Sequence, residues 1–88
     1  NQSNDNQQLR ADFSTFISGL YMECVIALGI TENPITKKKE KNMVHARYVI
    51  ETITMLKEKT KGNLEAGEIN LIDQILYELQ KVYAINAK

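Results

Sequence analysis

The stretch FSTFISGLYMECVIALGI, residues 13–30, constrains the fold more than any other part of this 88-residue chain. A helix that spans a bilayer requires about 20 apolar residues, and this stretch offers roughly 18. Glu23 interrupts it, at a cost of about 2.5 kcal/mol or more near a bilayer centre. Ser14, Thr15 and Ser18 weaken it further. We therefore interpret it as a helix of a soluble protein, and keep membrane association through this helix as a lesser alternative.

The length of the chain limits it to one small domain. A domain of this size buries only about 60–65% of its unfolded surface, so its core is marginal unless a second copy adds to it. Cys24 is the single cysteine and His45 the single histidine, which excludes an internal disulfide and a Cys/His zinc set. A lone cysteine fits a reducing compartment, and no basic and apolar leader precedes residue 13. We expect a cytoplasmic protein.

Three segments of the chain show an apolar period of 3.6 residues, and none alternates as a strand does. Gly29, Pro34 and Gly62 separate these segments. Each predicted helix follows a plausible capping residue, which is Asp12 for the first, Asn42 for the second and Glu65 for the third. The predicted helices span about 13–28, about 43–61 and about 66–85.

The short connection between the second and third helices requires an antiparallel hairpin. We expect Gly62, Asn63 and Leu64 to form its turn, with Gly62 closing the second helix in the left-handed conformation. The predicted fold is all-α, with the first helix packed on this hairpin and the whole completed by homodimerisation. It forms a single helical domain over residues 13–86, preceded by a disordered polar tail over residues 1–12.

Placing residues at intervals of 100° separates the buried sides of the three helices. The third helix has one apolar stripe with polar residues opposite, formed by Ile69, Ile72, Ile75, Leu76, Leu79, Val82 and Tyr83. The second helix is expected to bury Ala46, Val49, Ile50, Ile53 and Leu56. The first helix has a broad main arc, formed by Phe13, Phe16, Ile17, Leu20, Tyr21, Cys24, Val25 and Leu28.

The first two helices also carry apolar residues outside these buried sides. We expect a monomer to bury one of the two extra strips but not both, because exposed apolar surface of that extent marks an interaction site. The small residues Thr15 and Gly19 would let another backbone come close. The predicted self-association interface consists of Thr15, Gly19, Met22, Ile26, Val44, Tyr48 and Met55. The expected partner is a second copy, with an unidentified protein partner as the other possibility.

Positive charge gathers in the middle of a chain whose net charge is zero. Residues 37–61 carry eight basic side chains against three acidic ones, while the flanking segments are net negative. A patch of Lys37, Lys38, Lys39 and Lys41 could make a few phosphate contacts and give weak, salt-dependent binding. No aromatic residues interleave with these lysines to stack on bases. Weak nucleic-acid binding is therefore the first alternative, and we do not favour it.

Glu23, Cys24 and His45 are the only residues that invite a catalytic interpretation. Glu23 and Cys24 are adjacent and project about 100° apart on a helix. A Cys24–His45 pair would require the second helix to place His45 against the first. We interpret Cys24 as a small buried hydrophobic residue and Glu23 as an acid at the rim of the core. We expect no enzyme, no metal, no cofactor and no small-molecule substrate.

The run MLKEKTKGNLEAGEINLIDQILYEL, with FSTF and Leu28–Gly29 upstream, resembles the small bacterial proteins grouped as domain-of-unknown-function family 1844. The resemblance covers about residues 13–83. This chain differs from the usual pattern at Glu65, where the family has Thr, and in YMECVIALG, where the family is richer in alanine. The resemblance implies a compact all-helical protein. It implies no activity and therefore no functional residues.

The features above lead to one functional expectation. The chain is predicted to be a non-enzymatic, self-associating helical module that acts through protein contacts. Its expected partner is another copy of itself, and its role follows from binding and not from chemistry.

Overall fold

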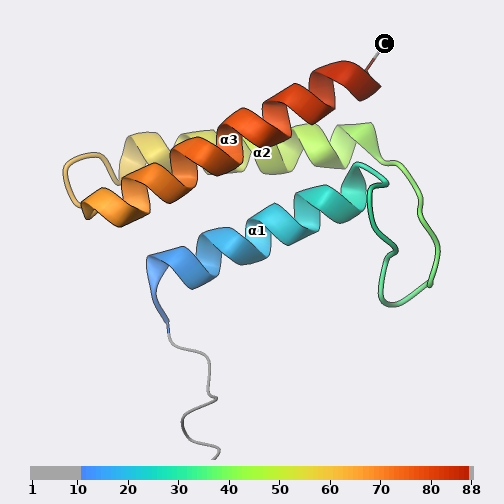
Figure 1. The fold of residues 1–88 in the computed structure, drawn as a ribbon, viewed down its shortest axis with the longest axis horizontal. Coiled ribbons are helices and arrows are strands. Elements are labelled where there is room, and N and C mark those ends of the chain that lie inside the picture. The colour runs from blue at the N-terminus through green and yellow to red at the C-terminus, as the bar shows by residue number, and fades with distance from the viewer. Residues whose placement is uncertain (1–10, 88) are drawn as a thin grey trace, which may run out of the picture.

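The computed structural model describes residues 11–87, and over that part of the chain it contains three helices and no strand (Figure 1). Helix α1 spans Phe13–Ala27, α2 spans Met43–Lys59 and α3 spans Ala66–Asn86. The all-α prediction is confirmed, and each helix ends within two residues of its expected end. The predicted tail lies almost wholly outside the described residues, because these begin at residue 11.

The starts of α1 and α2 are fixed by the predicted capping residues. The side chain of Asp12 accepts a hydrogen bond of 2.7 Å from the backbone N–H of Thr15. Asn42 does the same for the backbone N–H of His45, at 3.0 Å. Each bond satisfies one of the N–H groups that a helix leaves without an internal partner, which is why the helices begin where the sequence indicates.

The turn between α2 and α3 also forms as the sequence predicts. Gly62 has a φ of +89°, the left-handed conformation that glycine adopts at least cost. The backbone N–H of Glu65 donates to the Glu68 side chain at 2.8 Å, as in a capping box. Helix α2 ends at Lys59, slightly earlier than expected, and the hydroxyl of Thr60 donates to the carbonyl of Leu56. The result is the antiparallel α2–α3 hairpin seen in Figure 1.

The long loop between α1 and α2 returns the chain directly to the end of α1. Gly29 ends the helix with a φ of +77°. A Cβ added at Gly29 would lie only 2.8 Å from Cγ of Lys41, so the two chain segments are close. The backbone N–H of Asn42 donates to the carbonyl of Ala27 at 2.7 Å. This bond sets how far α2 is shifted along α1.

All three helices contribute to one hydrophobic core, and α1 contacts both α2 and α3. This arrangement confirms the prediction that the first helix packs on the hairpin. Phe13, Leu20, Tyr21, Leu56, Val82 and Tyr83 pack around the core while partly exposed. The buried core residues are Ile17, Cys24, Val25, Ala27, Leu28, Ala46, Val49, Ile50, Ile53, Ile72, Ile75, Leu76 and Leu79.

Phe16 is the exception to the predicted main arc of the first helix. Its side chain is 54% exposed, whereas the adjacent Ile17 is fully buried. Consecutive helical residues project about 100° apart. The arc that α1 buries is centred on Ile17 and Cys24, so Phe16 falls outside it. The prediction that Phe16 belongs to the buried arc is wrong.

Polar contacts at the rim of the core tie the helices together. The Tyr21 hydroxyl on α1 donates to the Glu78 carboxylate on α3 at 3.1 Å. Burial, followed by the contact with Glu78, raises the pKa of Tyr21 above its usual 10.0. Lys57 on α2 pairs with Asp73 on α3. The first contact joins α1 to α3, and the second joins the two helices of the hairpin.

Candidate functional site

The outer side of α1, which we define as Thr15, Gly19, Met22 and Ile26, lies opposite the residues that α1 buries. Helical spacing places the four residues on one side of the helix. Thr15 and Gly19 are exposed, Met22 is 51% exposed and Ile26 is half-buried. Glu23 is the only Asp, Glu, Lys or Arg in α1. The outer side of α1 is therefore an uncharged, largely apolar surface in contact with water.

Gly19 is not required by the fold of a single chain. Glycine in the middle of a helix costs about 0.5–1 kcal/mol relative to alanine. A Cβ added at Gly19 would have nothing within 4 Å, and its backbone does not adopt a positive φ. The space above Gly19 is therefore open, and another molecule can come close to the backbone of α1 there. We call this space, left by the missing side chain, the hollow over Gly19.

A second group of exposed apolar residues, the outer strip of α2, consists of Val44, Tyr48 and Met55. Their side chains are 82%, 64% and 46% exposed. The Tyr48 ring stacks on the His45 ring, with a distance of 6.1 Å between the ring centres. Tyrosine and methionine are among the residue types enriched at protein interfaces.

The predicted interface is therefore more exposed than the sequence suggested. We expected the monomer to bury one of the two strips, but the outer strip of α2 and three of the four residues on the outer side of α1 are exposed. That expectation is wrong. The physical reason is that α1 and α2 use only one side each for the core, and no fourth helix among the described residues covers either of the opposite sides.

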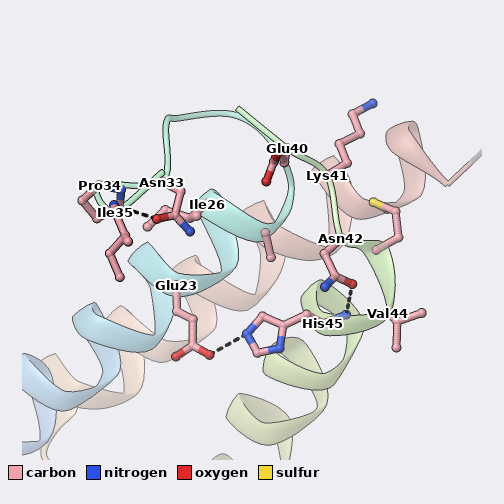
Figure 2. A pocket seen from close by; sticks show the side chains of 12 residues that line it. Glu23, Ile26, Asn33, Pro34, Ile35, Glu40, Lys41, Asn42, Val44 and His45 are labelled. Carbon is pink, nitrogen blue, oxygen red and sulfur yellow. Dashed lines mark hydrogen bonds and ion pairs between the residues drawn. The ribbon is translucent and has the colours of Figure 1, made fainter. Parts of the chain in front are cut away.

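Glu23 and His45 form an ion pair that joins α1 to α2. The Oε2 atom of Glu23 and the Nε2 atom of His45 are 2.7 Å apart, with both side chains partly exposed. Figure 2 shows the two side chains meeting from neighbouring helices. The sequence singles out both residues but does not pair them. Helical periodicity could not do so, because it gives the direction of a side chain and not the shift between two helices.

An open recess of about 710 Å³ lies beside this ion pair, between the end of α1, the loop and the start of α2 (Figure 2). Ile26, Ile35 and Val44 provide apolar parts of its lining. Asn33 lines it as well, and its side-chain oxygen is already used by the backbone N–H of Ile35, at 2.8 Å. Sequence reasoning missed Ile35, which is 87% exposed, because it lies in a loop without periodicity.

Cys24 does not line this recess, and the partner of His45 is Glu23 and not Cys24. It is fully buried, and its thiol lies 3.6 Å from the carbonyl oxygen of Ala46. Burial, followed by the negative charge of Glu23, raises the pKa of the Cys24 thiol to about 11. A thiol with this pKa is protonated near neutral pH and is a poor nucleophile. The interpretation of Cys24 as a small buried residue is confirmed.

The lysines of the predicted anion patch lie in the loop that precedes α2. Lys37, Lys38, Lys39 and Lys41 are all exposed. Lys37 has a φ of +64°, and its backbone N–H donates to the carbonyl of Asn33 at 2.7 Å. The patch is therefore held by a tight turn in the loop. Of its side chains, Figure 2 draws Lys41, which points away from the Glu23–His45 ion pair.

Two other kinds of site can be addressed over residues 11–87. No cluster of three or more His, Cys, Asp or Glu residues there is arranged to hold a metal ion. None of the three helices is both long enough and apolar enough to cross a membrane. The apolar stretch over residues 13–30 thus forms the 15-residue helix α1 and the first residues of the loop that follows it.

The whole helical unit corresponds to one known family. The family described as "Domain of unknown function (DUF1844)" matches residues 10–85. The chain belongs to this family. The match covers α1, the loop, the hairpin and nearly all of α3, as the resemblance in the sequence implied. Comparison with curated proteins and with solved structures gave no match.

Proposed function

We propose that this member of the DUF1844 family is a non-enzymatic interaction module that binds a second copy of itself through the outer side of α1. The observation that carries the proposal is the uncharged, exposed surface around Gly19 and Met22. Interface centres are depleted in charged residues and enriched in methionine and aromatic residues. A symmetric pair of chains would bury this surface twice with one set of contacts.

The energy available from this surface is large for so small a domain. Burial of apolar surface contributes about 25 cal/mol per Å², or about 1.5–3 kcal/mol for a whole methionine or isoleucine side chain. Covering the exposed parts of Met22 and Ile26 in two copies would therefore contribute on the order of a few kcal/mol. Natural domains have only about 5–15 kcal/mol of net stability. Self-association would stabilise the fold appreciably.

The chemistry of the remaining residues supports binding over catalysis. The buried, protonated thiol of Cys24 has the carbonyl of Ala46 as its partner, whereas the partner of His45 is Glu23. The free thiol of Cys24 also supports a reducing, cytoplasmic location as part of the proposal. The neighbouring outer strip of α2 would serve as the edge of the same interface or as the contact for a further protein.

Sedimentation of the purified protein tests the proposal. The wild type should be a dimer at about 100 μM, a concentration that populates dimers with Kd values up to the micromolar range. Met22→Glu should give a folded monomer, because Met22 is exposed in the single chain and the new charge would be buried only in the dimer. A monomeric wild type at this concentration would overturn the proposal.

A matched control separates the effect of position from the effect of charge. Tyr77 on α3 is 69% exposed, and Lys81 lies over its ring, with Nζ 6.0 Å from the ring centre. Tyr77→Glu adds the same charge to a surface that already carries charges. It should leave the dimer intact. Equal loss of the dimer in Met22→Glu and Tyr77→Glu would argue against the outer side of α1 as the interface.

A further inference from the structure

Building on the proposed self-association, we propose that the two copies of α1 pack antiparallel, with Met22 of each chain seated in the hollow over Gly19 of the other. The proposal specifies the orientation and register of the contact, which self-association alone leaves open. It rests on the spacing of the outer side of α1, on the open space above Gly19 and on the charge of the adjoining loop.

The spacing of the four outer residues defines the register. Thr15, Gly19, Met22 and Ile26 follow one another at intervals of four, three and four residues, the spacing of a coiled-coil contact line. The line is symmetric about a point midway between Gly19 and Met22. A twofold axis through that point places Gly19 opposite the partner's Met22. The same axis places Thr15 opposite the partner's Ile26.

Side-chain size favours this antiparallel pairing over a parallel one. In the antiparallel pair a methionine faces a glycine twice, and the flexible thioether fills the hollow. In a parallel pair Gly19 would face the partner's Gly19, while Met22 would face the partner's Met22. The contact between the two glycines would then leave a gap, and the contact between the two methionines would be crowded. Close packing requires the space at both positions to be filled evenly.

Charge in the loop points the same way. Figure 1 shows the loop between α1 and α2 extending past the C-terminal end of α1, on the side away from α3. The loop carries four lysines, at positions 37–39 and 41, against Glu32 and Glu40. A parallel pair would bring two such loops together at one end, where like charges repel. The antiparallel pair separates them and places each loop near the partner's Asp12 end of α1.

Disulfide trapping tests the register directly. A disulfide requires Cα atoms about 4.4–6.8 Å apart. Thr15 and Ile26 are separated by about 16 Å along α1, at a rise of about 1.5 Å per residue. A mixture of Thr15→Cys chains and Ile26→Cys chains should therefore form a cross-linked heterodimer under mild oxidation. Neither variant alone should cross-link, and the native Cys24 is too buried to compete.

Each outcome of the trapping experiment bears on a different claim. Cross-linking of Thr15→Cys with itself would show a parallel pair and overturn the register, while the proposed self-association would stand. A dimer that forms no cross-link in the mixture would place the interface elsewhere and also overturn the register. A wild type that sediments as a monomer would defeat the proposed function itself. A mixture of Thr15→Cys and Tyr77→Cys chains is the control and should not cross-link.

A swap of side chains gives a second test that does not depend on cysteine. Gly19→Met should weaken the dimer about tenfold or more, because two methionines then face each other at both levels. The single chain should still fold, since nothing lies within 4 Å of a Cβ at this position. Adding Met22→Gly to the same chain restores one methionine opposite one glycine. This double variant should regain most of the affinity, and failure to do so would contradict the register.

Discussion

Helices α1 and α3 both bury one side in the core, but their opposite sides have different chemistry. Between residues 70 and 81 of α3 the exposed residues are all polar, charged or tyrosine: Asn70, Asp73, Gln74, Tyr77, Glu78, Gln80 and Lys81. Exposed isoleucines lie only toward the ends of α3, where Ile69, predicted in the buried stripe, is 42% exposed and Ile85 is 63% exposed. On α1 the exposed residues include Thr15, Phe16, Ser18, Gly19 and Met22, and Glu23 is the only charge. The middle of α3 is therefore suited to contact with water in a way that the outer side of α1 is not.

The difference shows which part of the chain would gain from a partner. The exposed apolar residues Phe16 and Met22 lie on a helix whose one acid, Glu23, is engaged by His45. The exposed side of α3, by contrast, carries several charged side chains, among them Asp73, Glu78 and Lys81. Replacing water by protein on α1 therefore removes hydration from at most one charged side chain, whereas the same step on α3 would remove it from several. The contrast between two helices of similar burial is the basis for the predictions that follow.

The largest effect is expected on the inner side of α1. Ile17→Ala removes a fully buried side chain and leaves a cavity, so it should lower the free energy of unfolding by about 2–5 kcal/mol. Met22→Ala on the opposite side should change it by no more than about 0.5 kcal/mol in dilute solution. Urea denaturation of both variants at low protein concentration measures the two effects. Equal effects would mean that the assignment of inner and outer sides is wrong.

The next effect concerns the burial of Cys24, on the same inner side of α1, and its influence on stability at high pH. In the folded chain, burial raises the pKa of the Cys24 thiol from its usual 9.0 to about 11. Above about pH 9 the unfolded state binds fewer protons than the folded state, so the raised pKa stabilises the fold below that pH and the stabilisation is lost as the pH rises to about 11. The loss attributable to Cys24 should reach about 2 kcal/mol.

Comparison with Cys24→Ala isolates this contribution. The pKa of Tyr21 is also raised, so its titration lowers stability in the same direction as the pH rises. The wild type should therefore lose more stability between pH 9 and pH 11 than Cys24→Ala does, as followed by chemical denaturation. If the free energy of unfolding changed with pH in the same way for the two proteins, the thiol would not be buried as described in the folded state.

A smaller effect is expected at the turn of the α2–α3 hairpin. Gly62→Ala should cost about 1 kcal/mol, because alanine is strained at a φ of +89°. No atom lies within 4 Å of the added Cβ, so the cost comes from the backbone alone. A loss of this size lowers Tm by about 4–8 °C in a domain of this length. An unchanged melting curve would contradict the left-handed closure of α2.

The local features of this fold could be predicted from the sequence, because their causes lie within a few residues. Asp12 and Asn42 cap their helices through side chains that reach only three residues ahead. Gly62 closes α2 because glycine readily adopts the positive φ that this position requires. The buried stripe of α3 follows from helical periodicity, which predicts Ile72, Leu76 and Leu79 on one side.

The relations between helices could not be predicted in this way. The contact of Glu23 with His45 depends on the shift of α2 along α1, which is set by the bond from Asn42 to Ala27 after a long loop. The exposure of Phe16 depends on how wide an arc of α1 the hairpin covers. Periodicity gives the directions of side chains around the axis of one helix. It gives neither the shift of α2 along α1 nor the width of the arc that the hairpin covers. The candidate interface was therefore predicted as a set of residues, but its degree of exposure was not.

The smallest effect on stability is expected from Gly19→Ala. This substitution also tests most directly whether the outer side of α1 differs from that of α3. Gly19 resembles Gly62 in that an added Cβ meets nothing within the chain, but its backbone has ordinary helical angles. In dilute solution the substitution should therefore stabilise the protein by about 0.5–1 kcal/mol, because alanine favours the helix. The sign is opposite to that of Gly62→Ala, although the two changes are chemically identical.

The stability gained by Gly19→Ala should then become smaller as the protein concentration rises. If the partner's Met22 occupies the hollow over Gly19, the added methyl group disturbs the contact, so Gly19→Ala should weaken the dimer while it stabilises the single chain. Thermal melts over a range of concentrations measure both terms, because Tm of an associating protein rises with concentration. The Tm of the wild type should rise more steeply than that of the variant, so that the advantage of Gly19→Ala shrinks as concentration increases. A difference in Tm between Gly19→Ala and the wild type that stayed constant at every concentration would show that Gly19 faces water in the assembled protein. The outer side of α1 would then be a surface exposed to water, as that of α3 is, despite its different chemistry.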